Sequence, residues 1–282
     1  MRFFDTETCG LTGPIVTVQY ADDNDETKIH HVWESSALET LKLLEELADN
    51  VVCGFNLTYD WFHVQQMYNV LCLLDDIHSP LIDLIDEYAL LEPKARDGVC
   101  IKPKGALDLM LHARKGPYQS TMNRAPIKIR RIPTQIAWQL AEELDNSIKF
   151  DSIYFARSKK KTGNWRVADI TEDDGTINPN FKNIILDFKP SSALKVLAGH
   201  ALGLETQKYT EVEPPGYPKE FGYAPFALAV GDIRNWNLAW PQYISQHMYH
   251  WKYNPLAVKY ATNDVIFLQK LYEHFGCPPH SD

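Results

Sequence analysis

The sequence has few cysteines, and their number and spacing exclude the frameworks that cysteine usually builds. Five occur among 282 residues, at positions 9, 53, 72, 100 and 277, and no two are spaced as Cys-x-x-Cys. An odd number of scattered thiols indicates neither a disulfide scaffold nor a zinc site. We therefore expect a protein of a reducing, intracellular compartment.

Long apolar runs, internal repeats and low-complexity tracts are also missing. No run reaches the ~18 residues of a membrane-spanning helix, and the first residues lack the pattern of a signal peptide. Hydrophobic residues make up 45% of the chain and charged residues 23%, as in ordinary globular proteins. We expect one or two domains, a cytoplasmic location and no membrane partner.

Basic residues are scarce outside the middle of the chain. Residues 94–189 hold 18 Lys and Arg against 11 Asp and Glu, a net charge of +7, whereas the remainder holds 10 against 26, a net charge of −16. The split suggests that the middle segment faces a polyanion and that the acidic remainder holds other chemistry, such as metal ligands. A basic solvated surface is the simpler alternative.

The first seven residues, Met-Arg-Phe-Phe-Asp-Thr-Glu, predict a short strand that carries two carboxylates, Asp5 and Glu7. Side chains alternate along a strand, so both carboxylates point to one face. Two like charges this close are costly unless a cation lies between them, and hard oxygen ligands suit Mg²⁺ or Mn²⁺. By itself, Asp-x-Glu also fits an exposed edge strand with a solvated acidic face, so a metal site needs further ligands.

The next segments predict an antiparallel meander followed by a helix. β-branched residues indicate strands over 14–21 and 28–33. Ser36 and Glu39 have the spacing of a capping box, and leucines at helical intervals follow them.

A second acidic position follows a buried strand. The apolar run 51–55 predicts a strand of the parallel kind. Asn56-Leu57-Thr58-Tyr59-Asp60 then opens a helix, and the start of a helix after a buried strand is a common place for binding groups. Over residues 79–93 we expect a strand that runs into a helix ending before Pro93.

A third acidic position lies late in the chain. Two helices are predicted between residues 241 and 275, and the last one carries Tyr260 and Asp264. Their i, i+4 spacing places both side chains on one helical face. A further helix is predicted over 191–204, and residues 205–240 predict an extended loop.

Residues 94–190 predict a small basic α+β insertion. The strand-like pieces cover 127–132, 153–158, 165–170 and 183–188, and residues 134–144 are helical in pattern. Lys159, Lys160 and Lys161 lie at the tip of the predicted hairpin.

The three acidic elements, taken in order, resemble the DEDD superfamily of 3′–5′ exonucleases, in the subclass with a tyrosine in the third motif. The nearest resemblance is to the proofreading exonuclease domain of family A DNA polymerases. The matching stretches are Phe-Asp-Thr-Glu-Thr-Cys-Gly-Leu at 4–11, Gly-Phe-Asn-Leu-Thr-Tyr-Asp at 54–60 and Tyr-Ala-Thr-Asn-Asp at 260–264. The helix at 192–204 is similar to the Ser-Leu-x-x-Leu-Ala segment of the family. The resemblance covers residues 1–93 and about 191–275.

The resemblance implies an α/β fold, with an RNase H-like mixed β-sheet flanked by helices. It implies a metal-dependent 3′–5′ exonuclease that hydrolyses DNA phosphodiester bonds from the 3′ end and releases nucleoside monophosphates. Two divalent ions, Mg²⁺ or Mn²⁺, would be bound by four acids and would clamp the scissile phosphate. The implied ligands are Asp5, Glu7, Asp60 and Asp264.

The resemblance also implies roles around these acids. Tyr260 would orient the attacking water, because a tyrosine with a pKa of about 10 is a poor general base. Leu11 would wedge against the terminal base and Asn56 would hold the terminal nucleotides, with Thr6 and Thr8 binding substrate beside the acids. Leu11 and Asn56 also fit plain structural roles, in loop packing and in a turn.

Two features depart from the family. No polymerase domain accompanies the three motifs, so we expect a free-standing nuclease or one subunit of a split enzyme that proofreads for a separate DNA polymerase. The basic segment interrupts the core, which is therefore expected to consist of residues 1–93 and 191–282. The insertion, 94–190, is expected to touch the phosphate backbone through Lys159, Lys160 and Lys161, or to dock a partner.

The expected substrate is single-stranded DNA or a frayed 3′ end, in a module that would suit a bacteriophage or a bacterium. RNA is the first alternative, in the manner of an exoribonuclease like RNase D. The second alternative is a catalytically silent subunit that binds nucleic acid or a polymerase. The presence of all four acids argues against a silent subunit.

Overall fold

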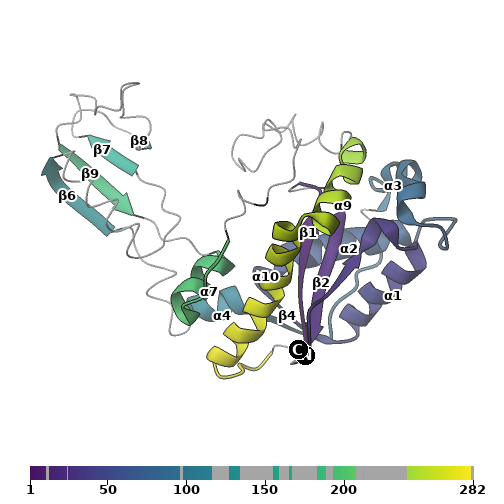
Figure 1. The fold of residues 1–282 in the computed structure, drawn as a ribbon, viewed down its shortest axis with the longest axis horizontal. Helices are drawn as coiled ribbons and strands as arrows, with labels where there is room; N and C mark the ends of the chain where they lie inside the picture. Colours follow the sequence, from purple (N-terminus) through teal and green to yellow (C-terminus); the bar gives the residue numbers. More distant parts are fainter. Residues whose placement is uncertain are drawn as a thin grey trace. The chain divides into compact units, whose positions relative to one another are not determined.

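The computed structural model describes residues 1–10, 13–23, 25–95, 98–115, 127–133, 155–158, 165–166, 183–188, 193–207, 212 and 240–280. The chain divides into two compact units. The first consists of Met1–Leu109 with Gln207–Asp282, and the second of Met110–Thr206. The first unit is a mixed α/β structure with a five-stranded sheet flanked by helices (Figure 1).

The sheet of the first unit joins a meander to two parallel strands. Its order is β3-β2-β1-β4-β5. β1 is antiparallel to β2 and parallel to β4, β2 is antiparallel to β3, and β4 is parallel to β5. The strands are β1 (Arg2–Thr8), β2 (Ile15–Asp22), β3 (Lys28–His31), β4 (Val51–Gly54) and β5 (Gly105–Asp108). The meander and the parallel strand after the first long helix, both predicted from the sequence, are therefore confirmed.

Helices cover both faces of this sheet. α1 and α2 pack on each other and on β4, whereas α9 and α10 pack on the β1–β2 pair, where α10 crosses the strands (Figure 1). The helices of this unit are α1 (Ala37–Ala48), α2 (Leu57–Leu71), α3 (Ile85–Leu91), α9 (Ile244–Tyr253) and α10 (Pro255–His274), with 3-10 turns η1 (Val32–Glu34), η2 (Leu81–Leu84) and η8 (Trp240–Gln242). Among the described residues, no helix combines the length and the hydrophobicity needed to cross a membrane.

Side-chain alternation along β1 decides which residues face which helices. The Phe3 ring packs on Tyr272 of α10, with ring centroids 5.5 Å apart, and the Phe4 ring packs on Trp61 of α2 at 6.1 Å. Because alternate strand residues share a face, the odd-numbered residues of β1 face α10 and the even-numbered residues face α2.

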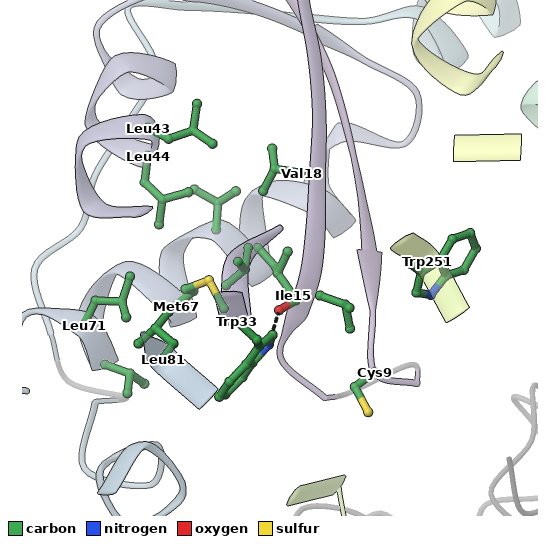
Figure 2. Packing of buried hydrophobic residues seen from close by; sticks show 14 of the residues in the cluster. Cys9, Ile15, Val18, Trp33, Leu43, Leu44, Met67, Leu71, Leu81 and Trp251 are labelled. Carbon is green, nitrogen blue, oxygen red and sulfur yellow. Dashed lines mark hydrogen bonds between the residues drawn. The ribbon is translucent and has the colours of Figure 1, made fainter. Parts of the chain in front are cut away.

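The apolar core on the α1–α2 side fixes the position of β2. Figure 2 shows Leu43 and Leu44 of α1 directed toward Val18 of β2, with Met67 of α2 in the same cluster of buried side chains. All four side chains are buried. Burial of aliphatic side chains of this size contributes about 1.5–3 kcal/mol each, which anchors the sheet against the helices.

Trp33 joins η1 to the start of β2. Its indole nitrogen donates to the backbone oxygen of Ile15 at 2.8 Å (Figure 2), and its ring packs on Tyr88 and Trp240. A buried tryptophan whose N–H has a partner adds packing without an unsatisfied polar atom.

The capping box at the start of α1 is confirmed. The hydroxyl of Ser36 accepts from the backbone N–H of Glu39, and the Glu39 carboxylate accepts from the backbone N–H of Ser36. We expect Ser36→Ala to lower the free energy of unfolding by about 1 kcal/mol, because the backbone N–H of Glu39 loses its acceptor. Chemical denaturation measures this change. Ser36→Thr keeps a hydroxyl and should lose much less; equal losses in both variants would contradict the capping role.

The boundaries between the units differ from those expected. β5 lies inside the predicted insertion of 94–190, yet it pairs in parallel with β4, Gly54 opposite Asp108. Helix α7 (Leu194–Leu202), expected in the core, falls in the second unit. The second unit therefore begins and ends later than the basic composition suggested. The charge of a segment does not indicate whether one of its strands pairs with the edge of the sheet.

The strand predicted after residue 79 does not form. Pro80 makes one isolated bridge to Ser36, and η2 followed by α3 occupies the segment. Asp76 accepts hydrogen bonds from the backbone N–H groups of His78 and Ser79, at 2.8 and 3.1 Å. This turn and the restricted φ angle of Pro80 favour a turn at this point, as aspartate and proline commonly do. The helical segments η2 and α3 follow it.

The second unit contains a four-stranded antiparallel sheet in the order β6-β9-β7-β8. Its elements are β6 (Ile127–Pro133), β7 (Phe155–Ser158), β8 (Trp165–Arg166), β9 (Asn183–Phe188) and α7, with α4 (Leu109–Lys115) crossing its first boundary. These strands confirm the predicted pieces at 127–132 and 183–188, and the parts of 153–158 and 165–170 that the structure describes. The predicted helix 134–144 and the hairpin tip with Lys159, Lys160 and Lys161 lie outside the described residues.

Candidate metal centre

Three carboxylates from the two ends of the chain meet on one face of the sheet. Asp5 and Glu7 lie on the α10 side of β1, and Asp264 lies on α10. One carboxylate oxygen of each lies within 4.8 Å of the others. Glu7 is 7% and Asp264 5% exposed, and Asp5 is partly buried.

The direction of α10 explains the meeting. Tyr272 packs on Phe3 near the start of β1, whereas Asp264, two helical turns earlier, reaches Asp5 and Glu7 near its end. The helix and the strand therefore run in opposite directions. Tyr260 lies one helical turn before Asp264 on the same helix.

The donor set suits a hard divalent cation. Mg²⁺ binds oxygen at about 2.1 Å, so two ligand oxygens on one ion lie at most ~4.2 Å apart. Since the oxygens of the three carboxylates lie within 4.8 Å of one another, they need at most a small contraction to reach that spacing. Bringing three acids together in a largely buried place is unfavourable without positive charge, and a bound cation would supply it.

Asp60 lies beside this cluster and is not one of its three close members. It is buried on α2, where its Oδ1 accepts from the hydroxyl of Thr6 at 2.6 Å and from the backbone N–H of Thr6 at 3.2 Å. Burial raises the pKa of Asp60 to about 7 against the opposing effect of the Thr6 hydrogen bonds, and the nearby charge of Asp264 raises it further. Of the four acids expected as ligands, Asp5, Glu7 and Asp264 thus form a close group. Asp60 lies beside that group and is hydrogen-bonded to Thr6.

The hydroxyls of Thr6 and Thr8 have partners inside the protein. Thr8 donates to the backbone oxygen of Gly10 at 2.6 Å, and its oxygen lies 3.1 Å from the hydroxyl of Tyr59. Burial raises the pKa of Tyr59 to about 12 despite the hydrogen bond with Thr8, and the nearby acids add to the shift. Tyr59 is therefore a protonated donor that holds Thr8. Substrate contact by Thr6 or Thr8 stays a prediction.

Asn56 begins α2 in an unusual backbone conformation. Its φ of 61° and ψ of 43° are left-handed, and its side chain is exposed and makes no capping bond. Asp108, at the end of β5, caps the helix instead: its two carboxylate oxygens accept from the backbone N–H groups of Asn56 and Leu57, both at 3.1 Å. The sequence analysis missed Asp108, because its role depends on the pairing of β5 with β4. Nucleotide binding by Asn56 stays a prediction.

Tyr260 is 9% exposed, and its ring packs near Trp251 of α9, with centroids 6.2 Å apart. The two tyrosines near the cluster thus come from different faces of the sheet. Leu11, expected to wedge against a base, lies outside the described residues, as do the three lysines of the hairpin tip.

Two buried polar residues on β2, Thr17 and Gln19, lie beside the acidic cluster on the neighbouring strand. Thr17 pairs with Glu7 and Gln19 pairs with Asp5 across the antiparallel ladder. Directly opposite residues share a face, so both point to the side that carries the acids. The sequence analysis predicted this strand from its β-branched residues and assigned no role to Thr17 or Gln19, although their alternation was a visible signal.

Comparisons with known proteins give no match: neither a family model, nor a curated protein, nor a solved structure matches this chain. The chemistry of the site must therefore be argued from its residues and their geometry.

Proposed function

We propose that this protein is a metal-dependent 3′–5′ exonuclease with an RNase H-like core, acting on the 3′ end of DNA. The observation that carries the proposal is the group formed by Asp5, Glu7 and Asp264. These acids come from distant parts of the chain and are largely buried. Binding a divalent cation is a role that would account for bringing them together.

The order of the motifs supports the proposal. The first motif lies on β1, the second opens α2 and the third lies on α10. The mixed sheet with helices on both faces is compatible with an RNase H-like core. Phosphodiester hydrolysis by this class of enzyme is what the resemblance implies.

The chain's own residues have distinct tasks in this proposal. Asp5, Glu7 and Asp264 would hold one divalent ion, and Asp60, beside Asp264, would contribute to a second. When bound, the ions would polarise the scissile phosphate and lower the pKa of the attacking water. Thr6 fixes one oxygen of Asp60 through two hydrogen bonds, and the charge of Asp264 acts on the same carboxyl group.

Tyr260 would position the attacking water through its hydroxyl. Its helix places it one turn from Asp264, and its packing near Trp251 restricts the ring. Holding a nucleophile in line contributes to rate without a proton transfer by the tyrosine.

The basic middle segment would add sequence-independent affinity for the phosphate backbone. A separate DNA polymerase is the partner that a proofreading role requires. Single-stranded DNA and frayed 3′ ends are the proposed substrates.

The test is a time course on 5′-labelled single-stranded DNA and on RNA of the same sequence, with Mg²⁺, with Mn²⁺ and with EDTA. We expect a ladder that shortens from the 3′ end, depends on the metal and proceeds faster on DNA. Faster cleavage of RNA would indicate an exoribonuclease. Binding without cleavage of either strand, also in the presence of a polymerase, would indicate a silent subunit.

The raised pKa of Asp60 predicts how a metal ion stabilises the fold. Between about pH 4, the usual value for an unfolded aspartate, and about pH 7, the folded carboxyl keeps a proton that the unfolded chain loses. The contribution of this group to stability is thus fully present at low pH and is lost as the pH rises through 7. A bound cation favours the ionised carboxylate and reverses the loss.

We therefore expect Mg²⁺ to raise the melting temperature more at pH 8 than at pH 5. At a concentration a hundredfold above Kd the stabilisation is about 2.7 kcal/mol, or roughly 5–10 °C. Thermal melts with Mg²⁺ and with EDTA at both pH values measure it. Asp60→Asn keeps an acceptor for Thr6 and should reduce the difference between the two pH values; an equal Mg²⁺ shift at pH 5 and pH 8 in the unmodified protein would contradict the prediction.

A further inference from the structure

Gln19 is a buried polar residue beside the acidic cluster. Its side chain is 0% exposed, and it lies on β2 directly opposite Asp5 of β1. Opposite residues in an antiparallel pair have Cβ atoms about 4.5–5.5 Å apart. Gln19 therefore belongs to the row of side chains that carries the proposed metal ligands.

One end of the Gln19 amide has a partner in the protein and the other has none among the residues that the structure describes. Nε2 donates to the hydroxyl oxygen of Thr17 at 2.6 Å. Oε1 is buried and accepts no hydrogen bond. A buried carbonyl oxygen without a donor is costly, and in native structures it commonly marks the place of a water or an ion.

The surroundings of Oε1 identify what is missing. The acids in the same row, Asp5 and Glu7, are acceptors when ionised, so they offer no proton to the amide oxygen. A donor must therefore come from outside the side chains of this row. A hydrated cation held by the carboxylates would bring such donors, because Mg²⁺ usually keeps several of its waters when it binds a protein.

We propose that Gln19 is an outer-sphere ligand, whose Oε1 accepts a hydrogen bond from a water bound to the cation at Asp5, Glu7 and Asp264. Thr17 holds the other end of the amide, so the oxygen is directed before the metal arrives. The inference rests on the metal centre of the proposed function and assigns a residue that none of the three motifs contains.

Metal affinity, measured without nucleic acid, tests the role. Gln19→Met keeps a side chain of similar length and removes the acceptor. Loss of an outer-sphere partner typically weakens metal binding by about 10–100-fold, so we expect a rise of that size in the Kd for Mn²⁺, measured by electron paramagnetic resonance. The melting temperature in EDTA should change little, because the loss of the hydrogen bond to Thr17 opposes the gain from replacing an unpartnered buried oxygen by an apolar group.

A matched control comes from α2. The Gln65 amide donates to the backbone oxygen of Val99 and accepts from the backbone N–H of Ile101 at 2.8 Å. Gln65→Met should lower the melting temperature in EDTA and leave the Kd for Mn²⁺ unchanged. If Gln19→Met behaves in this second way, Gln19 is a structural residue and the inference fails.

Two further outcomes are decisive. Gln19→Asn withdraws the amide by one methylene and should also weaken Mn²⁺ binding, which provides the test if the methionine variant does not fold. Unchanged Kd in a folded asparagine variant would overturn the role. Absence of Mn²⁺ binding by the unmodified protein would overturn the metal centre itself, whereas normal binding with unchanged variants overturns only the part assigned to Gln19.

Discussion

Asp5→Asn is expected to lower the rate of 3′-end cleavage by at least about a thousandfold, equivalent to ~4 kcal/mol of transition-state stabilisation. The substitution keeps the shape of the side chain and removes a charge from a group of three carboxylates whose oxygens lie within 4.8 Å of one another. With one negative charge fewer, the group attracts a divalent ion less and holds it less precisely. Single-turnover cleavage of labelled single-stranded DNA measures the effect.

The control is a second aspartate with no place in the site. Asp25 is exposed after β2, and Asp25→Asn makes the same chemical change there, so cleavage should be unaltered. DNA binding by the Asp5 variant should be retained, because binding depends mainly on contacts to the phosphate backbone. Cleavage at the normal rate by Asp5→Asn would contradict the assignment of Asp5 to the active site.

Asp108→Ala should destabilise the fold by about 2–4 kcal/mol, because two charge-assisted hydrogen bonds are lost at the start of α2. The first turn of that helix carries Asp60 and begins at the left-handed Asn56. A shift of that turn by about 1 Å could slow cleavage by about a hundredfold. Denaturant titration and steady-state kinetics measure the two effects. The Mg²⁺ concentration at half-maximal rate should change little, because the close group of three acids lies on β1 and α10.

Asp76 offers a matched comparison for this prediction. It also accepts from two backbone N–H groups, in a turn between α2 and η2. Asp76→Ala should destabilise the fold by a comparable amount, about 2–4 kcal/mol, and leave cleavage unchanged. Asp108→Asn keeps one acceptor, so its stability and its cleavage rate should lie between those of Asp108→Ala and of the unmodified protein. Equal loss of activity in the Asp76 and Asp108 variants would show that general destabilisation, and not the position of α2, limits cleavage.

The sequence predicted the local geometry of the candidate site well. Alternation along a seven-residue strand places Asp5 and Glu7 on one face, and a spacing of four residues places Tyr260 with Asp264. The capping box of α1 and the parallel strand after it follow from short-range patterns of the same kind. Each of these depends on residues close together in the chain, where backbone periodicity alone determines direction.

What the sequence did not predict depends on pairing between distant segments. The Gly-Ala-Leu-Asp of β5 has no β-branched residue and lies in a basic stretch, so its place at the edge of β4, and with it the role of Asp108, was not predicted. Asp60 was expected among the metal ligands, and its hydrogen bonds to Thr6, on the opposite face of β1, were not predicted. The position of Gln19 beside Asp5 follows from the register of β1 with β2, which no single segment specifies.

The path of α10 has a consequence for the timing of assembly. Gln269 of this helix donates to the backbone oxygen of Asp22, across 247 residues of chain. Closing a loop of that length costs roughly 5 kcal/mol in chain entropy, and a ribosome adding about 5–20 residues per second needs on the order of ten seconds or more to make it. During synthesis, β1 and β2 therefore exist before α10, which leaves Asp5, Glu7 and Gln19 without the helix that later covers them. Asp264 completes the cluster only when α10 docks, so a divalent ion held by all three acids, as proposed, would bind only chains in which this helix has docked.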